Sequence, residues 1–138
     1  MRFLVCVITT LGVMIASDAI WLGLSYVPLY QPQMAALLSA KPNLAAASAF
    51  YLLYALALNA LIVWPLVKTG QTDWPSLLWR AALFGLVTYG TYDLTGLAVI
   101  SYWPLPLSLI DMAWGMVITL FGAAGAALAV SLVWRRSK

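Results

Sequence analysis

Residues 107–134 read LSLIDMAWGMVITLFGAAGAALAVSLVW, and this stretch decides the class of the fold. It contains a single charged side chain, Asp111, among 28 consecutive residues. An apolar helix of about 20 residues is long enough to cross the hydrocarbon core of a bilayer. The stretch therefore predicts a transmembrane helix.

Three further apolar stretches precede it, at about residues 3–25, 44–67 and 76–100. The whole chain is 64% hydrophobic and only 8% charged, whereas an ordinary soluble domain is about a quarter charged. Prolines and short polar segments separate the apolar stretches, as they do between helices. The sequence predicts an all-α polytopic membrane protein, a bundle of four transmembrane helices that forms one domain over residues 1–138.

The basic residues are divided unevenly between the two sides of such a bundle. With four spans, the side that holds both termini carries six of them, and the other side carries only Lys41. The six are Arg2, Lys68, Arg80, Arg135, Arg136 and Lys138. Short cytoplasmic segments are enriched in Lys and Arg. We therefore expect a multi-pass protein of the bacterial inner (plasma) membrane with both termini in the cytoplasm.

Composition also narrows the range of functions. The 7 Lys and Arg residues form no cluster that could bind phosphates, so we expect no nucleic-acid partner. The chain has no histidine, and Cys6 is its only cysteine, which excludes the usual imidazole and thiolate metal sites. The sequence specifies no cofactor and leaves open a metal ion with oxygen ligands.

Three aspartates lie within the predicted spans at similar depth. Asp18 and Asp93 are each seven residues from the outer ends of their spans, roughly 10 Å deep by helical rise. Asp111 is four residues into the last span, roughly 6 Å deep. An ionisable side chain within a span costs at least about 2.5 kcal/mol on insertion scales. We therefore expect all three to face the bundle interior, in the outer third of the bilayer.

Aromatic side chains accompany these aspartates, because residues three or four positions apart share a helix face. We predict a binding site for a ligand or a proton at this depth. Besides the three aspartates, its predicted residues are Trp21, Trp114, Tyr92, Tyr89, Tyr54 and Thr95. Tyr30 and Trp103 lie near span ends, where we expect them to act as anchors at headgroup level.

Other polar and small residues have simpler expected roles. We expect Asp73 to cap the helix that follows it, and Asn59 to make a separate interhelical contact. The glycines and alanines from Gly115 to Ala129 are expected to let neighbouring helices pack closely.

Several segments of the chain resemble an uncharacterised bacterial family of small four-span membrane proteins, known as a domain of unknown function. The segments are D18-A-I-W-L-G23, T91-Y-D-L-T95 and D111-M-A-W-G115. The resemblance extends over nearly the whole chain. It implies the four-span fold and the positions of the aspartates, and it implies no activity.

No lysine or arginine is expected at the depth of the aspartates. Three carboxylates in a medium of low dielectric cannot all be ionised without a partner. The positive charge that balances them could come from a proton, from a metal ion that favours oxygen ligands, or from a cationic substrate that packs on Trp and Tyr rings. Alternatively, the aspartates could serve only to hold the helices together by hydrogen bonds.

The first functional hypothesis is proton-coupled or cation-coupled binding and transport of a small cationic or apolar solute. One bundle of four helices rarely encloses a complete path across a membrane, so this hypothesis predicts a homodimer. The second is a membrane enzyme in which paired carboxyl groups act as acid and base on a lipid or isoprenoid. The third is an accessory subunit of a larger membrane complex.

Overall fold

The computed structural model describes residues 1–39 and 41–135, and nearly all of these residues are helical. No strand occurs in this part of the chain. In chain order the elements are α1 (Arg2–Ser25), the π-helical turn η1 (Tyr26–Tyr30), α2 (Gln31–Met34), α3 (Leu44–Leu58), the π-helical turn η2 (Asn59–Val63), α4 (Trp64–Val67), α5 (Trp74–Val99) and α6 (Leu105–Arg135). The predicted all-α class is confirmed.

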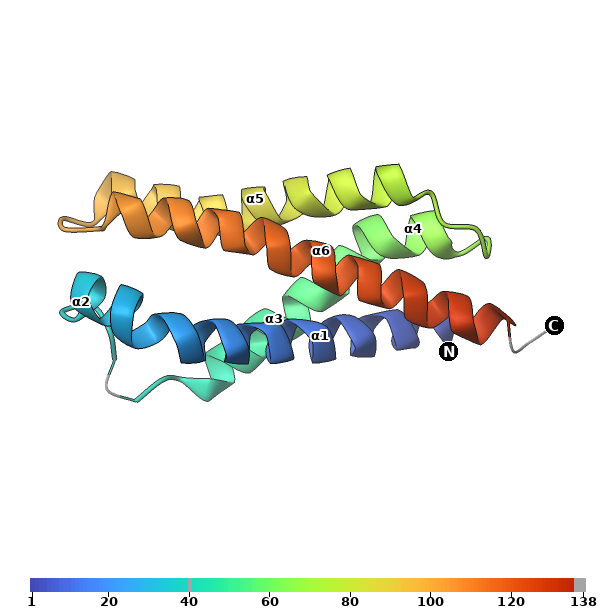
Figure 1. Ribbon diagram of the computed structural model, residues 1–138, viewed down its shortest axis with the longest axis horizontal. Coiled ribbons are helices and arrows are strands. Elements are labelled where there is room, and N and C mark those ends of the chain that lie inside the picture. Colours follow the sequence, from blue (N-terminus) through green and yellow to red (C-terminus); the bar gives the residue numbers. More distant parts are fainter. Residues whose placement is uncertain (40, 136–138) are drawn as a thin grey trace.

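These elements form four helical rods that run up and down the long axis of the molecule (Figure 1). α1, η1 and α2 form the first rod, and α3, η2 and α4 form the second. The helix α6 packs along both α1 and α5. The start of α1 and the end of α6 lie at the same end of the molecule, while α2 and the turn between α5 and α6 lie at the opposite end (Figure 1).

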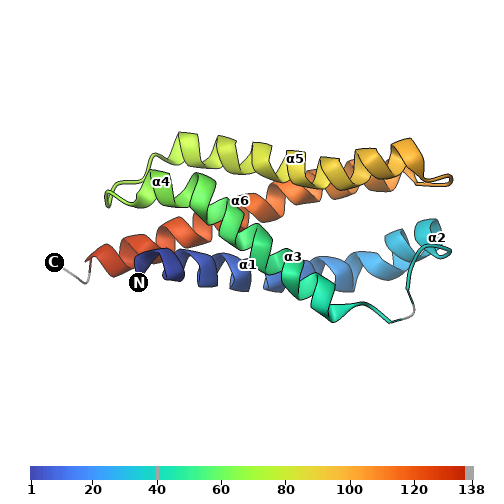
Figure 2. The same cartoon turned by 180° about the vertical axis from the view of Figure 1, so that it is seen from behind.

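The second rod crosses the other three at an angle, as Figure 2 shows. α3 begins beside α1 and reaches α5 at Tyr54, whose hydroxyl lies 3.1 Å from Oγ1 of Thr88 and whose ring contacts Phe84. Further along, η2 packs against α1, α5 and α6. The first turns of α3 therefore diverge from α5 at the end of the molecule that is remote from the termini.

Small residues allow α5 and α6 to approach closely. A Cβ atom added to Gly85 would overlap the carbonyl oxygen of Gly115, and one added to Gly115 would overlap the side chain of Tyr89, so both positions need glycine. Further along α6, Gly122 packs against Thr10 and Met14 of α1. The predicted packing role of the small residues in this stretch is confirmed.

A proline accompanies each π-helical turn. Pro28 lies within η1, and Pro65 is the second residue after η2. Proline lacks the N–H group of the regular ladder and its ring clashes with the carbonyl group four residues earlier, which a π-helical turn relieves. We expected the first span to end near Ser25. Because η1 accommodates Pro28, the helical path continues to Met34 instead.

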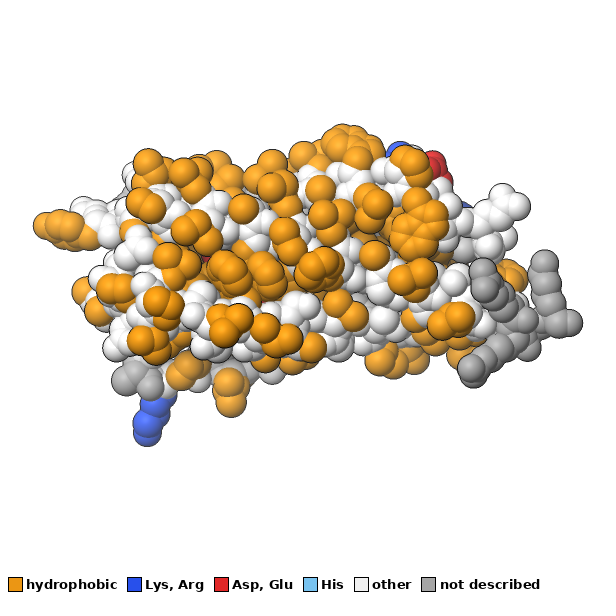
Figure 3. Space-filling view, viewed as in Figure 1, with side chains coloured by type: hydrophobic (Ala, Val, Ile, Leu, Met, Phe, Trp, Pro, Cys, Tyr) orange, Lys and Arg blue, Asp and Glu red, His pale blue; other side chains and the backbone are white. Residues whose placement is uncertain are grey.

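Three of the rods are long and apolar enough to cross a membrane: Arg2–Met34, Leu44–Val67 and Leu105–Trp134. α5 is also long, at 26 residues, but it carries Arg80, Asp93 and several threonines and tyrosines, and it is not among these three. Large hydrophobic side chains are exposed over the middle of the molecule, and the face in Figure 3 shows Lys and Arg only near its two ends. The chain is a helical membrane protein.

Two local predictions from sequence are confirmed. Asp73 caps α5, because its Oδ1 accepts a hydrogen bond of 3.2 Å from the backbone N–H of Ser76. Hydrogen bonding to Ser76 also lowers the pKa of the exposed Asp73 carboxyl. Asn59 joins two helices, since its Nδ2 donates to Oγ1 of Thr10 at 2.9 Å.

Candidate functional site

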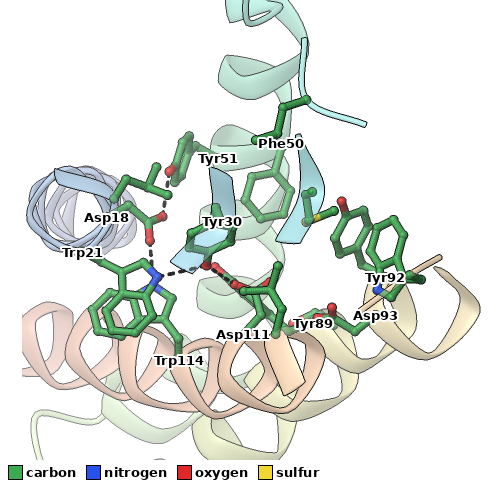
Figure 4. A pocket seen from close by; sticks show the side chains of 16 residues that line it. Asp18, Trp21, Tyr30, Phe50, Tyr51, Tyr89, Tyr92, Asp93, Asp111 and Trp114 are labelled. Atoms are coloured by element: carbon green, nitrogen blue, oxygen red, sulfur yellow. Dashed lines mark hydrogen bonds between the residues drawn. The ribbon is translucent and has the colours of Figure 1, made fainter. Parts of the chain in front are cut away.

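A cavity of about 510 Å³ lies at the end of the molecule that is remote from the termini. Residues from α1, η1, α3, α5 and α6 line it, and Figure 4 shows the side chains that point toward its interior. Its lining is mostly apolar and aromatic and includes all three aspartates, whereas no lysine or arginine of the described part of the chain contributes to it. The cavity exists because the first turns of α3 diverge from α5.

Asp18 holds three helices together at one side of the cavity. Its carboxylate accepts a hydrogen bond of 2.6 Å from the hydroxyl of Tyr51 on α3 and one of 2.8 Å from Nε1 of Trp114 on α6. The side chain is 8% exposed. Both of its oxygens therefore have a partner, and each partner comes from a different neighbouring helix (Figure 4).

Asp111 is joined to the opposite wall by a chain of hydrogen bonds. The hydroxyl of Tyr30 donates to Oδ1 of Asp111 at 2.6 Å and accepts from Nε1 of Trp21 at 3.0 Å. The indole of Trp21 also stacks on that of Trp114, with ring centroids 4.6 Å apart and planes 9° apart. Asp18 and Asp111 are thus connected through two stacked tryptophans and one tyrosine.

The π-helical turn η1 explains how Tyr30 reaches this position. In an uninterrupted α-helix, Tyr30 would lie about 120° around the helix axis from Asp18. One additional residue in the π-helical turn reduces this angle to about 20°, since it delays the helical phase by one position. Tyr30 therefore faces the same side of the rod as Asp18 and can bond Asp111.

Asp93 differs from the other two aspartates because one of its two oxygens is buried without a hydrogen-bond partner. It is 2% exposed, and its Oδ2 atom has no hydrogen-bond partner among the described residues. The carboxyl group of Asp93 interacts with the side chains of Asp111, Ser108 and Trp103, and Nε1 of Trp103 also donates to Ser108 at 2.9 Å. A buried polar atom without a partner is costly. Asp93 therefore lines the cavity with one buried oxygen unpaired, beside a second carboxyl group.

A family model described as "Predicted membrane protein (DUF2177)" matches residues 3–128. The chain belongs to this DUF2177 family. The resemblance drawn from the sequence motifs is therefore confirmed at the level of the family, whose function is not known. Searches of curated proteins and of solved structures returned no match.

Most of the residues predicted for the site of this DUF2177 protein lie together. Those that line the cavity are Asp18, Trp21, Tyr89, Tyr92, Asp93, Asp111 and Trp114. Tyr54 does not line it, because its hydroxyl is buried against Thr88 and Thr119. Thr95 is exposed and hydrogen-bonds the backbone of its own helix, and it lines an adjacent groove instead.

Sequence reasoning missed several residues that line the cavity of this DUF2177 protein. Tyr30 and Trp103 were expected at headgroup level, yet both line the cavity. Tyr51 was not included, although it lies at the same predicted depth as Asp18 and bonds it. Depth along a span could have identified Tyr51, whereas Tyr30 depends on the π-helical turn.

The carboxyl groups of this DUF2177 protein are not arranged as a metal site. Within residues 1–39 and 41–135, no group of three or more His, Cys, Asp and Glu side chains could hold a metal ion. Asp18 is bound by Tyr51 and Trp114, while Asp93 and Asp111 form a separate pair. The chemistry of the cavity therefore rests on two adjacent carboxyl groups among aromatic rings.

Proposed function

We propose that this DUF2177 protein is a four-span protein of the bacterial inner membrane that binds a cation at Asp93 and Asp111 in exchange for a proton. The exchange would couple the movement of a small cationic solute to that of protons. α5 would be the fourth span, both termini would lie in the cytoplasm, and the cavity would lie in the outer half of the bilayer.

One observation carries the proposal, namely the buried and unpartnered Oδ2 of Asp93 beside Asp111. Two adjacent carboxyl groups in a medium of low dielectric do not both stay charged without a counterion. Among residues 1–39 and 41–135, no basic side chain lines the cavity. The balancing positive charge would then come from a proton or a bound cation, and the two would compete for the same site.

The aromatic lining supports an organic cation as the competitor. Tyr89, Tyr92 and Trp103 line the cavity together with Asp93. The faces of such rings attract cations by an additional 0.5–2 kcal/mol or so, and more strongly where water is excluded.

The cavity is closed on the side that faces the termini, and this supports a role for a larger assembly in transport. Between the cavity and the termini the bundle interior is filled by side chains such as Leu58, Leu77 and Ile118, each 0% exposed. One chain in this conformation therefore has no open path from end to end. Transport would use a homodimer or a second conformation.

Flux in reconstituted vesicles tests the proposal. Vesicles that hold a pH-sensitive dye are given an outward proton gradient and then an external organic cation. The wild-type protein should move protons in response, and Asp93→Asn should slow this movement at least about tenfold, equivalent to about 1.4 kcal/mol. The matched control is Asp73→Asn, which changes an exposed capping residue to another good cap. Equal rates for the wild type and Asp93→Asn, with both proteins folded, would exclude proton-coupled transport through this pair.

A second candidate is a membrane enzyme, favoured by the open side of the cavity. Phe50 on α3 and Tyr92 on α5 both line the cavity and are 45% and 58% exposed, so the cavity opens between these helices toward lipid. A protonated Asp93 could add its proton to one carbon of an alkene while ionised Asp111 removes a proton from another. The double bond would move, with no net gain of protons and no cofactor.

Isotope exchange separates the two candidates. In heavy water, an isomerase of this kind would place deuterium in the lipid that it acts on, and mass spectrometry of the extracted lipids would detect it. Deuterium in lipid without any proton flux would favour the enzyme. Proton flux without deuterium in lipid would favour transport.

A further inference from the structure

The size of the cavity narrows the class of cation. Its volume of about 510 Å³ falls within the range of about 300–1,000 Å³ that is typical of sites for small organic molecules. A desolvated metal ion would instead need a close cage of about six oxygen ligands. The described residues supply no such cage, since Asp18 is occupied by Tyr51 and Trp114.

The chemistry of the lining narrows the class of cation further. Charge is concentrated at Asp93 and Asp111, whereas most of the remaining lining is apolar or aromatic. A small hydrophilic ammonium ion would lose its water and find few groups to replace it. A cation with a large apolar surface loses little on entering such a cavity and gains contact with the rings of Tyr89 and Trp103.

A groove of about 420 Å³ adjoins the cavity and leads to the surface. It lies between the segment that begins at Met34 and the last two turns of α5. The cavity and the groove share Met34, Leu38, Tyr92 and Trp103. None of the residues that line the groove is charged. The groove therefore offers an apolar approach to the carboxyl pair.

Two aromatic side chains stand where the groove meets the cavity. Tyr92 and Trp103 form an edge-to-face pair with ring centroids 5.1 Å apart and planes 74° apart. Tyr92 is 58% exposed, and beyond it Val99 is 81% exposed. The residues that line the groove come from the end of α2, the segment after it and the last turns of α5, so the groove opens at the end of the molecule where α5 ends.

The geometry points to a bulky, apolar organic monocation as the ligand of this DUF2177 protein, entering through the groove between α2 and α5. The inference rests on the proposed function, because it names the class of cation that Asp93 and Asp111 bind and the route that the cation takes. Leu38, Tyr92 and Trp103 form the passage from groove to cavity.

Competition binding to the full chain in lipid nanodiscs tests the class of ligand. Radiolabelled tetraphenylphosphonium is the probe, methylammonium and sodium are the small hydrophilic cations, and triphenylphosphine oxide is a neutral aromatic of similar shape. We expect tetraphenylphosphonium to bind at least about tenfold more tightly than each of the other three. A preference for methylammonium or sodium, or equal binding of the neutral compound, would overturn the inference.

Protection of an introduced thiol tests the route. Thr95→Cys places a thiol in the groove, and the native Cys6 is buried. A water-soluble maleimide should modify Thr95→Cys more slowly when tetraphenylphosphonium is bound. Ser101→Cys is the control, because Ser101 is exposed at the same end and does not line the groove. Equal protection of both thiols, or of neither, would contradict this route.

A third experiment narrows the passage between the groove and the cavity. Leu38→Trp adds bulk where groove and cavity meet, and Ala36→Trp adds the same bulk at an exposed neighbour that lines neither. Leu38→Trp should slow association of tetraphenylphosphonium at least about tenfold relative to Ala36→Trp. Unchanged association in Leu38→Trp would contradict the route, and the thiol protection test decides the matter if Leu38→Trp does not fold.

The failures of the two proposals can be distinguished. If Asp93→Asn binds every probe as the wild type does, the cation site itself is wrong. If Asp93→Asn abolishes binding but methylammonium binds as well as tetraphenylphosphonium, the site stands and only the ligand class is wrong.

Discussion

At the scale of single residues, the three aspartates have different surroundings. Asp18 accepts hydrogen bonds from two helices, Asp111 accepts one from Tyr30, and the buried Oδ2 of Asp93 accepts none. Asp18 is therefore bound in the manner of a structural residue. Asp93 is the carboxyl group with an unpaired buried oxygen, and for this reason it is the proposed site for a proton or a ligand.

The bond from Tyr51 to Asp18 should contribute measurably to stability. Tyr51→Phe removes a donor from a buried carboxylate and should lower the free energy of unfolding by about 1–2 kcal/mol. Tyr26→Phe is the control, since Tyr26 is 43% exposed. Unfolding in mixed detergent micelles measures both variants. Equal stabilities would show that the Tyr51 bond contributes nothing.

Counting residues predicts the depth of a side chain along a span. This count correctly placed Asp18, Asp93 and Asp111 at one end of the bundle. Depth does not say which face of a helix a side chain occupies. Tyr54 was included for its depth, but it lies one turn beyond Tyr51 and bonds Thr119 in the core.

At the scale of elements, apolar stretches and prolines in the sequence predicted where the helices end. The second rod spans Leu44–Val67, as expected, whereas the first continues from Ser25 to Met34. Polar residues and two prolines after Ser25 indicated a loop. A sequence pattern gives no direct sign of a π-helical turn, and without one the position of Tyr30 could not be predicted.

Deleting one residue tests the role of η1. Removing Pro28 takes away the additional residue of the π-helical turn and the proline that favours it, and should leave Tyr30 facing Asp111. Removing Val87 from the regular helix α5 should instead rotate the following residues, including Asp93, by about 100°. The temperature of thermal unfolding should therefore change little when Pro28 is deleted and markedly when Val87 is deleted. Equal damage from the two deletions would contradict this role for η1.

At the scale of the whole molecule, the position of the termini agrees with the proposed topology. The start of α1 and the end of α6 lie at one end, and η1, α2 and the turn between α5 and α6 lie at the other (Figure 1). The cavity is lined by residues from this second end. Six of the seven basic residues belong to the end with the termini in a four-span arrangement. The proposed topology requires α5 to span the membrane, although α5 carries Arg80 and Asp93.

Thiol labelling of intact cells tests that span directly. Gln71→Cys precedes α5 and Ser101→Cys follows it. If α5 crosses the membrane, an impermeant maleimide should modify Ser101→Cys from outside and leave Gln71→Cys unmodified until the cells are opened. Modification of both thiols from outside, or of neither, would show that α5 does not span.

The central claim is that a cation and a proton compete for Asp93 and Asp111. The most direct test is to count protons released as an organic cation binds to the protein in weakly buffered nanodiscs. We predict that the wild type releases a proton on binding in the pH range where the pair holds one, and that Asp93→Asn releases none. Binding without proton release across that range, or equal release from Asp93→Asn, would contradict the claim.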